Sequence, residues 1–121
     1  MWMLFIDQLL LENDEIRLSW RTIKMLEKLI TDNKENFKGY YVFAICMWKN
    51  KLCLVPCDDA MSGYYPVYDK AVNISDMPIV NFPNKINGQN IDAIILKLYK
   101  GSIEFDFAEN TWDGFQPLGD L

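Results

Sequence analysis

The sequence predicts a single α+β domain in which N-terminal helices pack on a mainly antiparallel sheet built from two β-hairpins. Three observations lead to this fold class: one amphipathic stretch of helical period over residues 16–30, and two pairs of apolar, β-rich runs that are each joined by a short polar turn. The 121 residues, 50% of them apolar, suffice for one hydrophobic core and are too few for two. We therefore expect one domain over residues 1–121.

The N-terminal part is expected to be helical. An Asn cap at Asn13, followed by Asp14 and Glu15, is typical of a helix start, because the cap accepts a backbone N–H and the acids match the helix dipole. Apolar residues then recur along one stripe, with bases on the other side; the stripe comprises Ile16, Trp20, Ile23, Leu26 and Ile30. The helix should end near residues 32–36. Residues 2–11 could form a first helix or an opening strand, and we favour the helix.

The first hairpin is expected to join a strand at Tyr40–Trp48 to a strand at Leu52–Val55. The polar turn between them contains Asn50, which tolerates the conformation that a tight hairpin turn needs. Pro56 should end the second strand or place it at an edge, because proline cannot donate a ladder hydrogen bond. Residues 58–90 are richer in proline and turn signals, and we expect short strands there near Tyr64–Tyr68 and Met77–Phe82.

The second hairpin is expected to join Ile91–Tyr99 to Ser102–Phe107 through a turn at Lys100 and Gly101. Apolar and polar residues alternate strictly in its last strand. This alternation predicts that Ile103, Phe105 and Phe107 point into the core while Glu104 and Asp106 stay exposed, since a strand places successive side chains on opposite faces.

The charge of the chain is one-sided. Residues 58–121 carry ten carboxylates and four lysines, whereas residues 1–57 carry seven acids and eight bases. A field of this sign repels nucleic acid and anionic membrane surfaces and attracts cationic proteins. The N-terminal run has neither the positive start nor the cleavage site of a signal peptide, so we expect a cytoplasmic protein with no membrane contact.

The residue inventory restricts the chemistry. There is no histidine, which removes the commonest general base and the fourth ligand that a zinc site on the three cysteines would need, and no glycine pattern fits a nucleotide-binding loop. Cys46, Cys53 and Cys57 are an odd number and are expected to be reduced thiols. We therefore predict no cofactor, no metal ion and no catalytic residue. The remaining enzyme alternative is a carboxylate-dependent hydrolase or phosphotransferase that would use the pairs Asp58-Asp59 and Glu104-Asp106.

The acidic C-terminal half also predicts a partner-binding surface. Carboxylates steer a cationic partner while exposed aromatic side chains anchor it. The candidate binding residues are Asp58, Asp59, Glu104, Asp106, Glu109, Trp112, Asp113 and Phe115. The alternative is that Trp112 and Phe115 cover an open end of the core and that the acids only keep the protein soluble. A third possibility is a structural or adaptor subunit that buries the apolar N-terminus in an oligomer.

The second hairpin ends in the pattern Gly101-Ser102-Ile103-Glu104-Phe105-Asp106-Phe107. A small, acidic, histidine-free chain with such a hairpin resembles the immunity proteins that neutralise bacterial toxins, including those of contact-dependent growth inhibition systems. The resemblance covers the two hairpins, Tyr40–Val55 and Ile91–Phe107. It implies a non-enzymatic inhibitor that binds a cognate toxin C-terminal domain, often a nuclease whose cationic cleft accepts an acidic surface.

Overall fold

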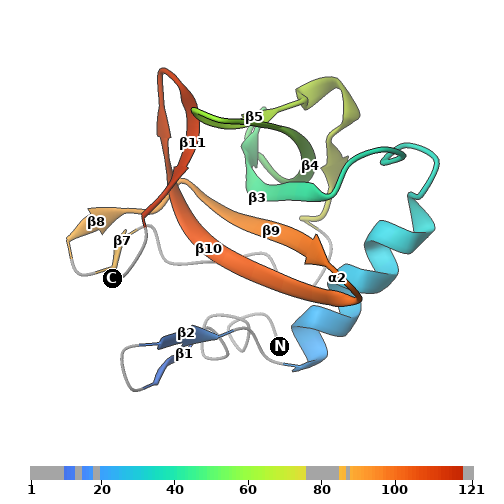
Figure 1. Ribbon diagram of the computed structural model, residues 1–121, viewed down its shortest axis with the longest axis horizontal. Coiled ribbons are helices and arrows are strands. Elements are labelled where there is room, and N and C mark those ends of the chain that lie inside the picture. The colour runs from blue at the N-terminus through green and yellow to red at the C-terminus, as the bar shows by residue number, and fades with distance from the viewer. Residues whose placement is uncertain (1–9, 13–14, 18–19, 76–84, 87, 119–121) are drawn as a thin grey trace.

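The computed structural model describes residues 10–12, 15–17, 20–75, 85–86 and 88–118 (Figure 1). Strands dominate this part of the chain, and one α-helix and one short 3₁₀-helix accompany them. The elements are β1 (Leu10–Glu12), β2 (Glu15–Arg17), α2 (Trp20–Asp32), β3 (Val42–Trp48), β4 (Lys51–Ala60), β5 (Gly63–Pro66), η1 (Tyr68–Lys70), β6 (Val72–Asn73), β7 (Lys85–Ile86), β8 (Gln89–Asn90), β9 (Ala93–Tyr99), β10 (Ser102–Thr111) and β11 (Gly114–Pro117).

Six of these strands form a closed antiparallel barrel. The strand order is β3-β9-β10-β11-β5-β4, and the pairing of β4 with β3 closes the ring, while β6 adds to β4 outside it. The predicted fold class, N-terminal helices on a sheet of two hairpins, is therefore wrong. Both predicted hairpins exist, but the short strands β5 and β11 connect them into a barrel. Closure depends on a pairing between residues far apart in sequence, Tyr64 and Phe115, which no local pattern reveals.

The N-terminal prediction is wrong at the helix start and correct from Trp20 onward. Glu15–Arg17 is strand β2, not the first turn of a helix, and it pairs with Leu10–Glu12, of which Leu10 and Leu11 were predicted to be helical. The backbone N–H and C=O groups of these residues therefore find partners in the β1–β2 ladder and not in a helix. The helix α2 begins at Trp20 and ends at Asp32, so its end agrees with the prediction. Residues 2–9, with Asn13 and Asp14, lie outside the described residues.

The first hairpin is confirmed. Lys49 and Asn50 form its two-residue turn, and both have positive φ, 51° and 63°, as the turn that matches strand twist requires. The prediction for Pro56 is wrong, because β4 continues to Ala60. The carbonyl oxygen of Pro56 accepts a hydrogen bond from the Val67 N–H at 2.8 Å, on the side away from β3. Its missing N–H therefore costs the β3–β4 ladder nothing.

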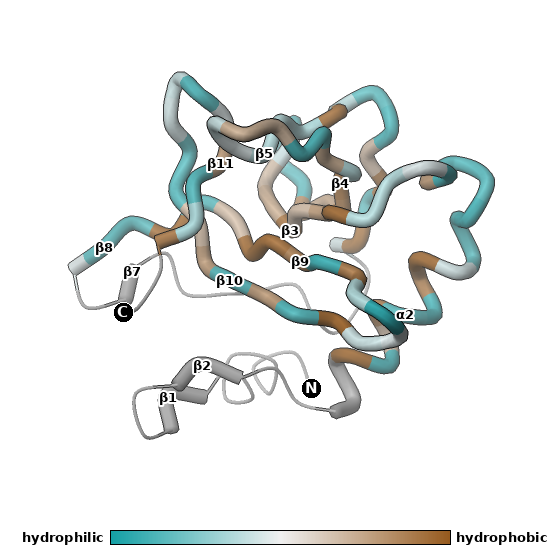
Figure 2. The backbone as a smooth tube through the Cα atoms, viewed as in Figure 1, coloured by the Kyte–Doolittle hydropathy of each residue, from teal (hydrophilic) through white to brown (hydrophobic). Residues whose placement is uncertain are grey.

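Strands β3, β4 and β9 are buried on both faces over most of their length, which explains the unbroken apolar run of β3. One face points into the barrel and carries mostly small side chains, namely Val42, Ala44, Cys46, Cys53, Val55, Cys57, Ala93, Ile95, Ala108 and Phe115. The other face carries larger residues such as Phe43, Ile45 and Leu96, and packs under α2 through the fully buried Leu26. Figure 2 shows hydrophobic colouring along the central strands and hydrophilic outer turns.

The second hairpin is also confirmed, with Lys100 and Gly101 in its turn at φ values of 47° and 84°. Along β10, Phe107 is buried, and Ile103 and Phe105 are half-buried against the core beneath α2. Glu104 and Asp106 are exposed, so the predicted alternation is correct.

The intervening residues are more ordered than predicted. Residues 58–60 extend β4, and β5 lies within one residue of the expected strand start, but Tyr68 belongs to η1 instead. The strand expected at Met77–Phe82 lies outside the described residues. None of the helices in the described ranges is long and apolar enough to cross a membrane.

Candidate functional site

The β4–β5 and β10–β11 hairpins concentrate negative charge. Residues 57–66 and 102–117 contain no lysine or arginine, and their carboxylates are Asp58, Asp59, Glu104, Asp106, Glu109 and Asp113. The structure divides these acids between two places because the barrel strands alternate between an inner and an outer face. We name them the mouth cluster and the tip surface.

The mouth cluster comprises Asp59, Lys97, Glu104 and Asp106, with Tyr41 and Tyr64 beside them. Asp59, Lys97 and Asp106 each continue a row of residues that faces the barrel interior: Val55 and Cys57 precede Asp59, Ala93 and Ile95 precede Lys97, and Ala108 follows Asp106. Glu104 lies directly opposite Lys97 across the β9–β10 ladder. Polar groups thus replace the apolar interior where the strands end.

Lys97 lies at the centre of the mouth cluster. Its Nζ is 5.2 Å from the centre of the Tyr64 ring. A hydrogen bond with Tyr64 raises the pKa of Lys97, and the negative charges of Asp106 and Asp59 raise this pKa further. Tyr41 donates a hydrogen bond to Asp59 at 2.6 Å, which raises the tyrosine pKa. The lysine therefore remains charged and neutralises part of the cluster.

Asp106 is the member of the mouth cluster whose ionised form is least favourable in the fold. Although its side chain is exposed as a whole, desolvation raises the pKa of its carboxyl, and nearby Glu104 adds to this effect. The positive charge of Lys97 opposes the shift without cancelling it. Ionised Asp106 is thus less favourable in the folded chain than in the unfolded chain.

Asp106→Asn is expected to be more stable than the wild type at neutral pH. Because the folded pKa is raised, the favourable contribution of protonated Asp106 is complete below its unfolded pKa and is lost as pH rises through the folded pKa. Urea unfolding at a series of pH values should show the two midpoints converging in acid and separating above the folded pKa. A variant that is less stable than the wild type at neutral pH would contradict this assignment.

The tip surface comprises Asp58, Met61, Glu109, Trp112 and Asp113. Met61 and Trp112 occupy the β4–β5 and β10–β11 turns, and their side chains are essentially fully exposed. Asp58 lies opposite Tyr65 across the β4–β5 ladder, and Glu109 lies opposite Gln116 across the β10–β11 ladder. Both apolar side chains are therefore open to contact by a partner.

Side-chain hydrogen bonds lock the two turns together. The Tyr65 hydroxyl donates to the Asp113 carboxylate and lies 2.9 Å from the Ser62 hydroxyl. The Gln116 side chain donates to the carbonyl oxygens of Ser62 and Asp113. Gly63 allows this approach, because a Cβ there would overlap the Asp113 carbonyl and the Gln116 amide. The tip surface is therefore held rigidly.

Phe115 cannot contact a partner. It is 2% exposed and packs inside the barrel with Val55 and Ile95, so its assignment as a binding residue is wrong. Strand β11 alternates, and Phe115 occupies an inward position opposite Tyr64. The predicted alternative, in which Phe115 covers the core, applies to this residue and not to the exposed Trp112.

The three cysteines also belong to the barrel interior. Cys46 and Cys53 face each other across the β3–β4 ladder, and all three thiols are free and buried. Burial raises the pKa of the Cys46 and Cys57 thiols to about 12. They are packing residues and poor nucleophiles, since the thiolate is the reactive form.

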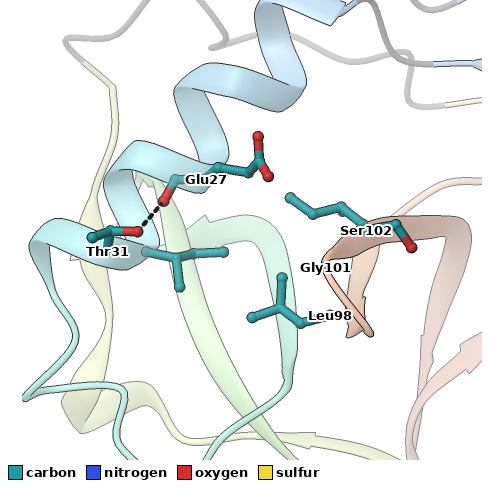
Figure 3. A pocket seen from close by; sticks show the side chains of 7 residues that line it. Glu27, Thr31, Leu98, Gly101 and Ser102 are labelled. Atoms are coloured by element: carbon teal, nitrogen blue, oxygen red, sulfur yellow. Dashed lines mark hydrogen bonds between the residues drawn. The ribbon is translucent and has the colours of Figure 1, made fainter.

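A separate groove lies between α2 and the β9–β10 turn (Figure 3). It has a volume of about 250 Å³ and is lined by Glu27, Ile30, Thr31, Leu98, Gly101, Ser102 and Ile103. Glu27 is the sole ionisable residue of this lining, and it forms an ion pair with Lys24 at 3.7 Å. A single paired carboxylate offers no acid–base pair, so we do not place chemistry in this groove.

Sequence reasoning found the acids and Trp112 but missed Tyr41, Met61, Tyr64 and Lys97. Lys97 carried a signal, because it is the single charge within the apolar run of β9. Met61 carried no such signal in the sequence, because the exposure of its side chain depends on how the β10–β11 turn lies beside it. Among the described residues, no group of three or more acids or cysteines is arranged to hold a metal ion.

Comparisons with known proteins give no relative: no family model matches the chain, and neither a curated protein nor a solved structure resembles it significantly.

Proposed function

We propose that this chain is a non-enzymatic immunity protein, which binds and neutralises a cognate bacterial toxin domain of cationic character in the cytoplasm. The observation that carries the proposal is the tip surface, where exposed Met61 and Trp112 lie on two locked turns among carboxylates. The tip surface carries three acids, Asp58, Glu109 and Asp113, and the β4–β5 and β10–β11 hairpins that form it contain no base. A surface of this kind fits a basic protein domain, because charge steers association and an aromatic anchor slows dissociation.

The rigidity of the tip surface favours protein binding over a merely solvated turn. Ordering flexible side chains and loops on binding costs free energy, and a surface that is already held in place avoids part of this cost. The Tyr65–Asp113 and Gln116–Ser62 hydrogen bonds hold both turns before any partner arrives.

The proposal predicts that a neighbouring gene encodes a toxin with a basic C-terminal domain, and this domain is the probe for the test. Co-expression of the chain should protect cells from that domain, and the two purified proteins should form a complex. Trp112→Ala should weaken the complex by about 2 kcal/mol, mainly through faster dissociation, if Trp112 is a central anchor. Asp58→Lys together with Glu109→Lys should slow association and flatten its salt dependence, because peripheral charges act on the on-rate.

Two control variants test whether the effect on association is confined to the tip surface. Asp69→Lys introduces the same reversal on the exposed η1 residue, outside the tip surface, and should leave association nearly unchanged. Lys28→Glu reverses a base on α2, whose exposed face would suit an acidic partner instead. If Lys28→Glu slowed association and the tip variants did not, the acidic-surface proposal would be wrong. Absence of both protection and complex formation would reject the immunity function.

A further inference from the structure

Within the proposed function, on which this inference rests, we propose that the tip surface selects arginine over lysine side chains of its partner. A guanidinium group would stack on the Trp112 indole and donate hydrogen bonds to the neighbouring carboxylates of Asp113 and Asp58. The partner is thus a basic protein surface that presents arginine at the centre of the contact.

The Trp112 ring is free to receive a cation. Trp48 shows the contrasting situation: Tyr68 stacks on its ring at 4.0 Å, and the Lys49 Nζ lies 5.5 Å from the ring centre. No ring or cation within the described residues covers Trp112, which is 96% exposed. Tryptophan is the aromatic side chain that attracts cations most strongly, and arginine is the cation that most often stacks on it.

The carboxylates around Trp112 are placed to complete this recognition. Asp113 follows Trp112 directly, and its backbone N–H donates to the Thr111 hydroxyl at 3.1 Å. The Tyr65 hydroxyl donates to one oxygen of its carboxylate, Oδ1, which orients the group and leaves Oδ2 for another donor. Asp58 pairs with Tyr65 across the β4–β5 ladder, so it lies on the same face of that ladder as the tyrosine, and it is exposed.

This combination of groups discriminates between the two basic side chains. A guanidinium is planar, weakly hydrated and carries five N–H donors, so it can stack on the indole and bind carboxylates at its edge together. A lysine ammonium is a compact, strongly hydrated charge that must lose water to approach the ring. Charge alone would treat both equally, and the stacking on Trp112 creates the difference.

The test compares two peptides of equal charge, hexa-arginine and hexa-lysine, by calorimetric titration of the full chain. Hexa-arginine should bind at least about tenfold more tightly, and the preference should persist at physiological salt while both affinities fall. Trp112→Ala should reduce the ratio to about twofold or less, and Asp113→Asn should weaken hexa-arginine more than hexa-lysine. Tyr99→Ala, which removes an exposed aromatic on another turn, should leave the ratio unchanged.

Equal affinities for the two peptides, no binding of either, or a preference that survives Trp112→Ala would each overturn the arginine inference. Circular dichroism of each variant confirms that the barrel is intact, and Trp112 is too exposed for its truncation to create a core cavity. These outcomes are separate from the proposed function, whose own test is growth protection by the chain against the toxin domain. Protection without an arginine preference would reject this inference alone.

Discussion

Phe107→Ala is expected to lower the free energy of unfolding by about 3–5 kcal/mol, because truncating a buried phenylalanine removes apolar contacts and leaves a cavity. Phe107 is 4% exposed and belongs to the core cluster that includes Leu26 of α2, and its ring meets the Phe105 ring edge-on at a centroid distance of 6.3 Å. The control is Glu104→Gln on the opposite face of the same strand, which should change stability by less than about 0.5 kcal/mol. Urea unfolding followed by circular dichroism measures both.

The comparison tests the register of β10. A shift of one residue would exchange the two faces, burying the acids and exposing the three apolar side chains. Comparable losses of stability in Phe107→Ala and Glu104→Gln would therefore contradict the arrangement in which Phe107 is buried in the core and Glu104 is exposed. Phe105→Ala should fall between the two variants, since Phe105 is half-buried.

The parts of the fold that could be predicted are local. Each hairpin has its strands adjacent in sequence and a turn whose residues favour positive φ, so pattern and turn chemistry agree. Barrel closure is not local, because Tyr64 and Phe115 meet across 50 intervening residues and belong to strands of four residues each. The apolar run of β3 was correctly assigned to a strand. Because the run is unbroken, it also indicated that both faces of this strand are buried, which a single sheet with one exposed face does not provide.

The candidate site was predictable in composition and not in arrangement. The acids and Trp112 stand out in the sequence, yet strand alternation sends Asp58 to the tip surface and Asp59 to the mouth cluster. Phe115 was misassigned because an aromatic near the chain end looks exposed until its register with Tyr64 is known. Met61 could not be identified as a surface residue from the sequence, because its position depends on the turns that the pairing of β5 with β11 brings together.

Gly114→Ala is expected to destabilise the barrel by about 3 kcal/mol, the sum of unfavourable backbone strain and overpacking. Gly114 has φ of 85°, and a Cβ at this position would lie 2.7 Å from the Tyr64 carbonyl oxygen. This is the seam at which β11 meets β5, and a single residue pair, Phe115 with Tyr64, joins the two strands there. The backbones cannot separate without opening the barrel.

Gly101→Ala provides the matched control for this seam. Gly101 has nearly the same φ, 84°, but a Cβ there would meet nothing within 4 Å. It should therefore cost only the strain of the left-handed backbone, about 1 kcal/mol. Because the seam also holds the turns of Met61 and Trp112, Gly114→Ala should weaken hexa-arginine binding, whereas Gly101→Ala should not. Equal losses of stability in the two variants would mean that β5 and β11 do not approach closely, and the locked tip surface would lose its physical basis.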